Sequence, residues 1–275
     1  MQAHTVEGGG GLTLHVRKWG DPQGAAIFFI HAWSQNHLCW THQFDSDLTD
    51  EFRLVAIDIR GHGMSDKPLE AEHYTDARLW ADDLAAVISS LGLERPVLVG
   101  WSYGGFIICD YVRAYGEGSI AGINYVAGAL MLNENLENIG PGFIDHIEGA
   151  TVPDLPTNIS AMRSFLRACT AEPMSEGDWE TALCFNIVVP PQVRLALVSR
   201  QLDSDDVLSE MTIPVLVTHG DQDTVVLPSM AQHVLEVCPT AEASWYERVG
   251  HAPFLEDPER FNRELADFTR RVVNG

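Results

Sequence analysis

The stretch Pro96-Val97-Leu98-Val99-Gly100-Trp101-Ser102-Tyr103-Gly104-Gly105 decides the expected fold. Its first half is a short, continuously apolar run, which predicts a strand covered on both faces, as in a parallel sheet. Its second half sets Ser102 between glycines, directly before residues 104–115, whose apolar period predicts a helix. A sharp strand-to-helix turn needs small residues beside the serine and projects the hydroxyl out of the sheet. The stretch therefore predicts a nucleophile elbow with Ser102 as the nucleophile.

Apolar strands and helical segments alternate on both sides of this junction. Further strands are predicted at residues 25–30, 52–57, 120–126, 213–218 and 243–246. Helices are predicted at residues 38–48, 76–91, 228–237 and 258–272. The glycine run at residues 8–11 neither follows a buried strand nor opens a helix, so it predicts a hairpin turn and not a phosphate loop. This order predicts an α/β fold, a mostly parallel central β-sheet flanked by helices.

The alternation is interrupted between residues 131 and 210. This segment has helical stretches, no convincing strand and several prolines: Pro141, Pro153, Pro156, Pro173, Pro190 and Pro191. We interpret residues 131–210 as an inserted helical cap, or lid, above the carboxyl ends of the strands. Residues 1–130 and 211–275 then form the α/β core.

A serine hydroxyl becomes an effective nucleophile only when a base within hydrogen-bond reach takes its proton. Of the 11 histidines, His251 is the best candidate, because it follows the last predicted strand in a loop at the carboxyl edge of the sheet. The base in turn needs a buried carboxylate after a neighbouring strand. Asp223 fits this position, and its rival Asp221 lies nearer the strand end, where a turn or cap role is expected.

Acyl transfer also requires backbone N–H groups aimed at the developing oxyanion. The sequence predicts these donors at Trp33, which follows the strand ending at Ile30, and at Tyr103. Three further side chains are candidates for an apolar substrate pocket, although each fits plain core packing equally well: Trp101, Phe143 and Trp179. His62, between two glycines, is interpreted as a turn residue and not as a catalytic group.

Composition limits the partners. The 39 acidic and 17 basic residues leave a formal net charge of -22, which repels nucleic acid and favours neutral substrates such as esters or lactones. Five scattered cysteines lack CxxC spacing, and no export signal or membrane-length apolar run is visible, so a cytoplasmic protein without membrane contact is expected. Neither a metal nor an organic cofactor is expected, and homo-oligomerisation is left open.

The chain resembles the α/β-hydrolase superfamily and, within it, the cofactor-free haloperoxidase and aryl-esterase (carboxylesterase) subgroup. The motifs that carry the resemblance are His31-Ala32-Trp33, residues 58–65, Gly100 to Gly105, residues 219–223 and Gly250 to Phe254. Serine at the nucleophile position disfavours the dehalogenase and epoxide-hydrolase chemistries of the family. One departure is Ala32, where the family usually has glycine, and alanine there is expected to strain the oxyanion loop by about 1 kcal/mol.

The resemblance and the motifs together predict a serine hydrolase that cleaves carboxylic esters through an acyl-enzyme on Ser102. Similar proteins also open lactones or form peracids from carboxylic acids and peroxide, so perhydrolase and lactonase activities are alternatives on the same triad. A hydrolase-like receptor that binds a small molecule without turnover is a third hypothesis.

Overall fold

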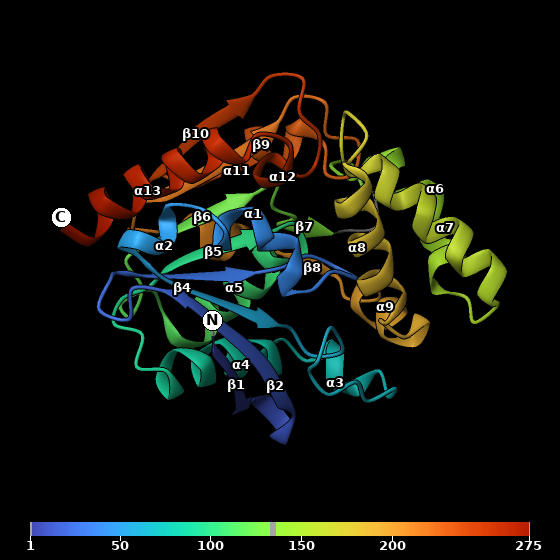
Figure 1. Ribbon diagram of the computed structural model, residues 1–275, viewed down its shortest axis with the longest axis horizontal. Helices are drawn as coiled ribbons and strands as arrows, with labels where there is room; N and C mark the ends of the chain where they lie inside the picture. Colours follow the sequence, from blue (N-terminus) through green and yellow to red (C-terminus); the bar gives the residue numbers. More distant parts are fainter. Residues whose placement is uncertain (1, 133–135, 275) are drawn as a thin grey trace.

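The structure, a computed structural model, is centred on an eight-stranded sheet with the order β1-β2-β4-β3-β5-β6-β9-β10 (Figure 1). It describes residues 2–132 and 136–274, so residues 1, 133–135 and 275 of the predicted core and cap lie outside the described residues. The strands are β1 (Gln2–Glu7), β2 (Thr13–Gly20), β3 (Ala26–Ile30), β4 (Arg53–Asp58), β5 (Val97–Trp101), β6 (Gly122–Val126), β9 (Val215–Gly220) and β10 (Ala241–Tyr246). β2 pairs antiparallel with β1 and β4, and the other neighbours pair parallel. The predicted mostly parallel sheet is confirmed.

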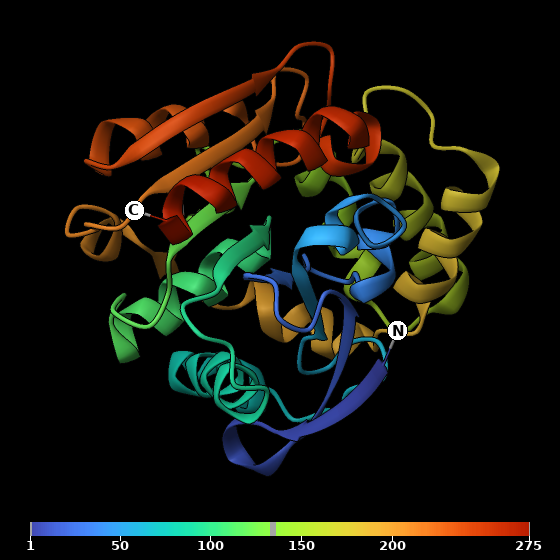
Figure 2. The same cartoon turned by 60° about the vertical axis from the view of Figure 1, so that its left-hand side comes forward.

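Helices cover both faces of this sheet. One face packs against α1 (Thr41–Phe44), α2 (Leu48–Glu51), α12 (Pro253–Glu256) and α13 (Pro258–Asn274). The other face packs against α4 (Ala77–Ser90), α5 (Tyr103–Tyr115) and α11 (Pro228–Val237). Figure 2 shows α13 crossing the front of the sheet. Shorter elements are η1 (Gly9–Gly11), η2 (His37–Trp40), α3 (Glu72–Thr75) and α10 (Asp205–Leu208).

The strand β3 shows why the central strands are continuously apolar. Ile27 and Phe29 join the hydrophobic cluster on the α13 side, whereas Phe28 and Ile30 join the cluster on the α5 side. All four side chains are fully buried. Because side chains alternate between the two faces of a strand, a strand with helices on both faces has no position left for water.

The segment predicted as one crossover helix at residues 38–48 is broken into η2, α1 and α2. Trp40, Phe44 and Leu48 still bury the expected apolar stripe. The break falls at Ser46, whose hydroxyl donates to the carbonyl of Gln43 and accepts from the N–H of Leu48. Such local bonds compete with the helical ladder, which explains the interruption.

Between β6 and β9 the chain forms, besides the short α10, the helices α6 (Pro141–Thr151), α7 (Leu155–Ala168), α8 (Glu176–Ile187) and α9 (Pro191–Val198), which lie on the right of Figure 1. The prediction of no strand in this segment was wrong, because β7 (Met131–Leu132) and β8 (Leu202–Asp203) pair as a short antiparallel ribbon. Two-residue strands are too short to show a periodicity in the sequence. Among the described helices, none alone is long and apolar enough to cross a membrane; α8 and α9 meet that test only together, across an 86° bend.

The elbow glycines allow α5 to lie directly against the sheet. A Cβ atom on Gly104 would come within 2.5 Å of the carbonyl oxygen of Ile30 in β3, which is backbone and cannot swing away. A Cβ atom on Gly100 would lie 2.9 Å from the backbone of Gly104. The glycines beside Ser102 are therefore a steric requirement of this strand-to-helix junction.

Replacing Gly104 with alanine should destabilise the protein by about 2 kcal/mol or more, because the added methyl overpacks against rigid backbone. The measurement is the urea unfolding free energy. Gly118→Ala is the matched control, since nothing lies within 4 Å of its added Cβ, and it should change stability by less than about 0.5 kcal/mol. Equal stability of the two variants would contradict this account of the elbow.

Candidate active site

Ser102 lies at the end of β5 in a strained backbone conformation. Its φ of 51° and ψ of -114° are unfavourable for a residue with a Cβ atom. Three backbone hydrogen bonds hold it there: its N–H donates to Val126, and its carbonyl accepts from Gly105 and Ala129. Strain of this kind persists only where the surroundings over-determine it, and it is typical of a nucleophile elbow.

His251 and Asp223 are brought together from two loops that follow neighbouring parallel strands, β9 and β10. Nδ1 of His251 lies 2.7 Å from Oδ2 of Asp223, and both side chains are buried. The other carboxylate oxygen, Oδ1, accepts the N–H groups of Val225 and Val226 at 2.8 and 3.0 Å. The carboxylate is thus fixed from one side and aimed at the imidazole from the other.

The environment keeps Asp223 ionised. Burial by itself would raise the pKa of this carboxyl, but the neighbouring His251 together with His219 outweighs burial and lowers the pKa to about 2. Asp221, the rival in the sequence, is exposed and accepts the N–H of Arg248 in the adjoining turn. The structure therefore sets Asp223, and not Asp221, against His251.

Trp101 connects the histidine loop to the elbow. Its indole N–H donates to the carbonyl oxygen of His251 at 2.8 Å, and the two rings lie 5.6 Å apart. Because Trp101 directly precedes Ser102, this bond links the backbone of the His251 loop to the elbow. The hydroxyl of Ser102 has no hydrogen-bond partner, His251 included, in residues 2–132 and 136–274.

The two predicted oxyanion donors are unused. Neither the backbone N–H of Trp33 nor that of Tyr103 finds an acceptor in the part of the chain that the structure describes. Tyr103 is the first residue of α5, where a helix leaves its N–H groups unpaired and carries the positive end of its dipole. A cavity that contacts Trp33 and Tyr103 also contacts Ser102.

The prediction of backbone strain at Ala32 was wrong. Ala32 does not have a positive φ, and the left-handed residue of this loop is Ser34, with φ of 64°. A left-handed residue with a Cβ atom is strained and needs hydrogen bonds to hold it, and in this loop those bonds are made by Ser34. Its N–H donates to Nε2 of His62 at 3.0 Å, and its hydroxyl accepts from the guanidinium of Arg194 at 2.9 Å.

Two buried neutral histidines, His31 and His62, accept backbone N–H groups around the loop that follows β3. His62 donates from Nδ1 to the carbonyl of Arg60 and accepts Ser34 at Nε2, so its turn assignment understated its role. His31 likewise donates to Ala32 and accepts the N–H of Ile59. Burial lowers the pKa of His31 to about 4 and holds the pKa of His62 well below its usual value. Both rings therefore keep the unprotonated nitrogen that the loop requires.

The cavity at Ser102 is small and apolar. Its volume is about 40 Å³, and its walls are Trp33, Ser102, Tyr103, Phe106, Ala129, Leu132, Ile139, Phe143, Val198, Val225 and Val226. Phe143 of α6 is thus on the cavity wall. Trp101 instead lines a separate pocket of about 370 Å³ between α8 and the α12 region. Trp179 lines neither space, and its ring lies 5.0 Å from the guanidinium of Arg167.

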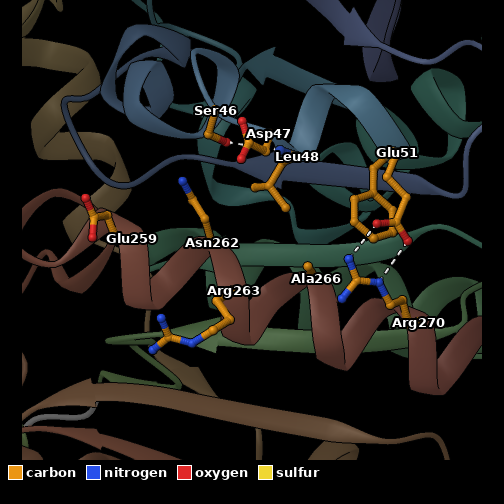
Figure 3. A pocket seen from close by; sticks show the side chains of 10 residues that line it. Ser46, Asp47, Leu48, Glu51, Glu259, Asn262, Arg263, Ala266 and Arg270 are labelled. Carbon is orange, nitrogen blue, oxygen red and sulfur yellow. Dashed lines mark hydrogen bonds and ion pairs between the residues drawn. The ribbon is translucent and has the colours of Figure 1, made fainter.

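A hollow of about 440 Å³ between α2 and α13 contains none of these residues (Figure 3). Its walls carry the ion pair between Glu51 and Arg270. In Figure 1, α2 and α13 lie on the left, on the opposite side from α6 to α9. The hollow therefore does not belong to the Ser102 site.

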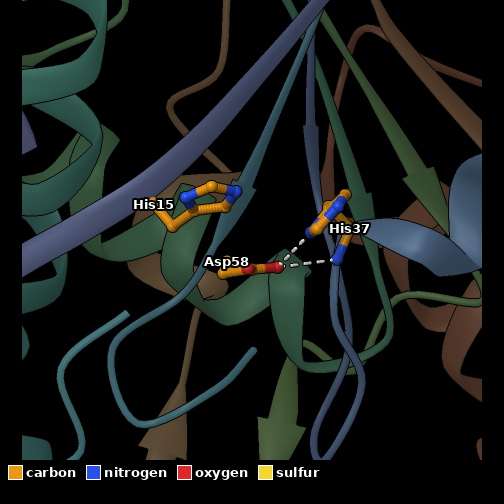
Figure 4. Close-up of side chains that lie close together, drawn as sticks. All are labelled: His15, His37 and Asp58. Atoms are coloured by element: carbon orange, nitrogen blue, oxygen red, sulfur yellow. Dashed lines mark hydrogen bonds and ion pairs between the residues drawn. The ribbon is translucent and has the colours of Figure 1, made fainter. Parts of the chain in front are cut away.

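His15, His37 and Asp58 form a buried cluster with the residue types of a metal site (Figure 4). Both the Nδ1–H and the backbone N–H of His37 donate to Oδ1 of Asp58, and the N–H of Met64 donates to Oδ2. Burial would raise the pKa of Asp58, but the bond and charge of His37 lower it to about 2. In this geometry both oxygens of Asp58 are used to hold the turn, which accounts for the cluster without a metal. Nothing in the structure explains why Nε2 of His15 has no partner among the described residues.

Similarity to known proteins extends over the whole chain. A family model described as the alpha/beta hydrolase family matches residues 27–264. The structure of a protein described as an aryl esterase from Burkholderia cenocepacia is similar, with a TM-score of 0.94 and 38% identity over 100% of both chains. The esterase RhEst1 from Rhodococcus sp. ECU1013 has a TM-score of 0.93 and 35% identity, over 99% of this chain and 100% of its own. The non-heme chloroperoxidase CPO-A1 of Kitasatospora aureofaciens is 28% identical over 278 residues, 95% of this chain and 97% of that protein.

Because His31 and His62 are neutral in the folded protein, we expect the free energy of unfolding to fall as the pH decreases from 6.5 to about 4. Well above pH 6.5 the His31 ring is neutral in both the folded and the unfolded protein. Between pH 6.5 and about 4 the ring becomes protonated in the unfolded chain but stays neutral in the folded protein. One such group accounts for about 3 kcal/mol of unfolding free energy by pH 4. Urea unfolding at pH 7.0, 5.5 and 4.5 measures the slope.

His31→Gln is the matched variant for this prediction. It should be less stable at pH 7 but should show a shallower slope between pH 6.5 and 4. The carboxylates Asp58 and Asp223 do not interfere, because a folded pKa of about 2 moves their contribution below pH 3.8. An unchanged slope in the variant would remove His31 as the source.

Proposed function

This chain belongs to the alpha/beta hydrolase family, and on that premise we propose that it cleaves carboxylic esters through an acyl-enzyme on Ser102. The family resemblance seen in the motifs, including the haloperoxidase and esterase members, is confirmed by the similar proteins. The observation that carries the proposal is the strained elbow at Ser102, joined through Trp101 to His251, which is in turn bonded to Asp223.

The proposed reaction has two steps, acylation of Ser102 and hydrolysis of the acyl-enzyme, and both use His251 and Asp223. Nε2 of His251 takes the proton of Ser102 as Oγ attacks the ester carbonyl, and ionised Asp223 stabilises the imidazolium that forms. The N–H groups of Trp33 and Tyr103 receive the oxyanion of the tetrahedral intermediate. His251 then gives the proton to the leaving alcohol. A water molecule, deprotonated by the same imidazole, releases the acid.

The cavity favours a short, uncharged acyl group. A volume of about 40 Å³ is room for only a few heavy atoms, since a single water needs about 10–15 Å³ of the same measure. Apart from the hydroxyl of Ser102, its walls are hydrophobic and aromatic side chains. The net charge of -22 adds a field that disfavours anionic substrates. Acetyl and propionyl esters fit these constraints best.

Perhydrolysis is the second candidate, supported by the relative named a non-heme chloroperoxidase. Hydrogen peroxide would attack the acyl-enzyme in place of water and leave as the peracid, while Ser102 regains its proton from His251. The chemistry needs no change in the triad, and a small acyl cavity suits acetate as the acyl source. Lactone opening is a third use of the same groups.

Replacing Ser102 with alanine should abolish turnover of p-nitrophenyl acetate, by about 10⁴-fold or more in kcat, because the nucleophile is lost. The fold should remain, as judged by circular dichroism and thermal unfolding. A fluorophosphonate probe should label the wild-type protein at Ser102, located by mass spectrometry, and should not label the variant.

Ser65→Ala is the control, since its hydroxyl is buried in a turn and bonded to the carbonyl of Asp58. Retained turnover by Ser102→Ala would refute the mechanism. A burst of one product equivalent without further turnover in the wild type would indicate a receptor. Comparing product release with water and with added peroxide separates esterase from perhydrolase activity.

Phe143 should limit the length of the acyl chain, because its ring forms part of the cavity wall and contacts Trp33 edge-on at 5.3 Å. The wild type should prefer p-nitrophenyl acetate to the octanoate by about tenfold or more in kcat/KM, and Phe143→Ala should shift the preference toward longer chains. Trp179→Ala is the control, since Trp179 lines no part of the cavity, and its chain-length profile should match the wild type. An unchanged profile in Phe143→Ala would place the acyl group elsewhere.

A further inference from the structure

Arg194 of α9 is a buried cation without a carboxylate partner. Its side chain is fully buried and forms no ion pair with any described residue. The other two buried arginines each have one: Arg60 lies 2.7 Å from Asp83, and Arg200 lies 2.7 Å from Asp110. A buried charge is normally paired because its desolvation is costly, so the exception at Arg194 calls for an explanation. Burial lowers the pKa of its guanidinium to about 10, which still leaves the group charged at neutral pH.

The guanidinium of Arg194 donates hydrogen bonds to four segments of the chain. Nη1 donates to the carbonyl of Ala150 in α6 and to Oδ1 of Asn158 in α7, at 3.0 and 2.8 Å. Nη2 donates to the carbonyl of Asn186 in α8. Nε donates to the hydroxyl of Ser34, at 2.9 Å. One side chain therefore ties three cap helices to the loop that follows β3.

A second contact runs in the opposite direction. The indole N–H of Trp33 donates to the backbone carbonyl of Arg194 at 3.1 Å. Consequently α9 holds both residues of the loop, Trp33 through its ring and Ser34 through its hydroxyl. Ser34 is the residue whose positive φ turns the chain directly after the Trp33 N–H.

We infer that Arg194 is a positioning residue that orients the oxyanion-donating N–H of Trp33 by holding Ser34 in its left-handed conformation. The inference rests on the proposed function. It makes the cap a working part of the oxyanion site, because the loop receives its bond from Arg194 only when α6, α7, α8 and α9 are packed together on the core. A donor that is misplaced by about 1 Å costs on the order of 10²-fold in rate, so this bond affects the transition state more than substrate binding.

The test compares Arg194→Met, Ser34→Ala and the double variant in the full-length protein. Arg194→Met removes the donor, and Ser34→Ala removes the acceptor with little change in volume. Each single variant should lower kcat for p-nitrophenyl acetate by about 10- to 100-fold while KM changes less than about threefold. The inhibition constant of a phenylboronic acid, whose tetrahedral adduct requires the oxyanion donors, should rise by the same factor as kcat falls.

Two comparisons separate positioning from general stability. The double variant should be at most about threefold slower than Arg194→Met, since the bond from Arg194 to Ser34 is shared and Ser34→Ala removes in addition only the 3.4 Å donation of the Ser34 hydroxyl to the carbonyl of Asn186. Asn158→Ala removes a different acceptor of the same guanidinium, so it should lower the unfolding temperature but keep kcat within about threefold of the wild type. Additive losses in the double variant, or an equal kcat loss in Asn158→Ala, would overturn the inference.

The remaining outcomes are also decisive. If Arg194→Met does not fold, Ser34→Ala alone carries the test, and normal kcat in that variant overturns the inference. If the wild type neither turns over p-nitrophenyl acetate nor reacts with a fluorophosphonate, the proposed function fails. If the wild type is active and both single variants match it, the esterase proposal stands and only the positioning role is refuted.

Discussion

The reversal of the chain from β5 into α5 constrains everything else in this molecule. Ser102 adopts a φ of 51° that only a surrounding network can hold, and the network consists of bonds from the ends of β6 and α5. The helix reaches this position because Gly104 lets its backbone pass within contact distance of β3. Since the strands around β5 are parallel, their carboxyl ends meet at this same edge. The loops that carry Trp33, Asp223 and His251 therefore converge on the elbow.

Burial and hydrogen bonding together set the charge state of each group at this edge. Asp58 and Asp223 remain ionised in the interior because hydrogen-bond donors surround their oxygens, and their pKa values lie near 2. His31 and His62 remain neutral because burial lowers the pKa of each ring, which preserves the acceptor nitrogens that support the loop after β3. The same interior thus holds anions and neutral imidazoles side by side, and the difference lies in which hydrogen bonds each group receives.

The helices α6 to α9 contribute to the surroundings of Ser102 and of the loop after β3. Phe143 and Val198 supply walls of the small cavity at Ser102, and Arg194 supplies a bond to Ser34 in the loop after β3. A cavity formed by two layers changes its size whenever the layers move relative to each other. In the proposed reaction, the size of the acyl cavity and the position of the Trp33 N–H would consequently be linked through the same helices.

The sequence by itself determined the fold class, the alternating order of strands and helices in the core, and the candidates Ser102, Asp223 and His251. Each of these rests on a local signal. An apolar run without alternation, a serine between glycines and polar residues directly after strands are all visible within a few positions. The short strands β7 and β8 and the break at Ser46 were not visible, since too few residues carry their pattern.

Only the tertiary structure decided how the site is supported. It moved the strained turn from Ala32 to Ser34, directed the ring of Trp101 to His251, left Trp179 outside the cavity and brought Arg194 to a residue 160 positions away. A bond between distant segments leaves no periodicity or spacing in either segment. The bond between Arg194 and Ser34 depends on how α9 packs against the loop after β3, so no local pattern in the sequence could have revealed it.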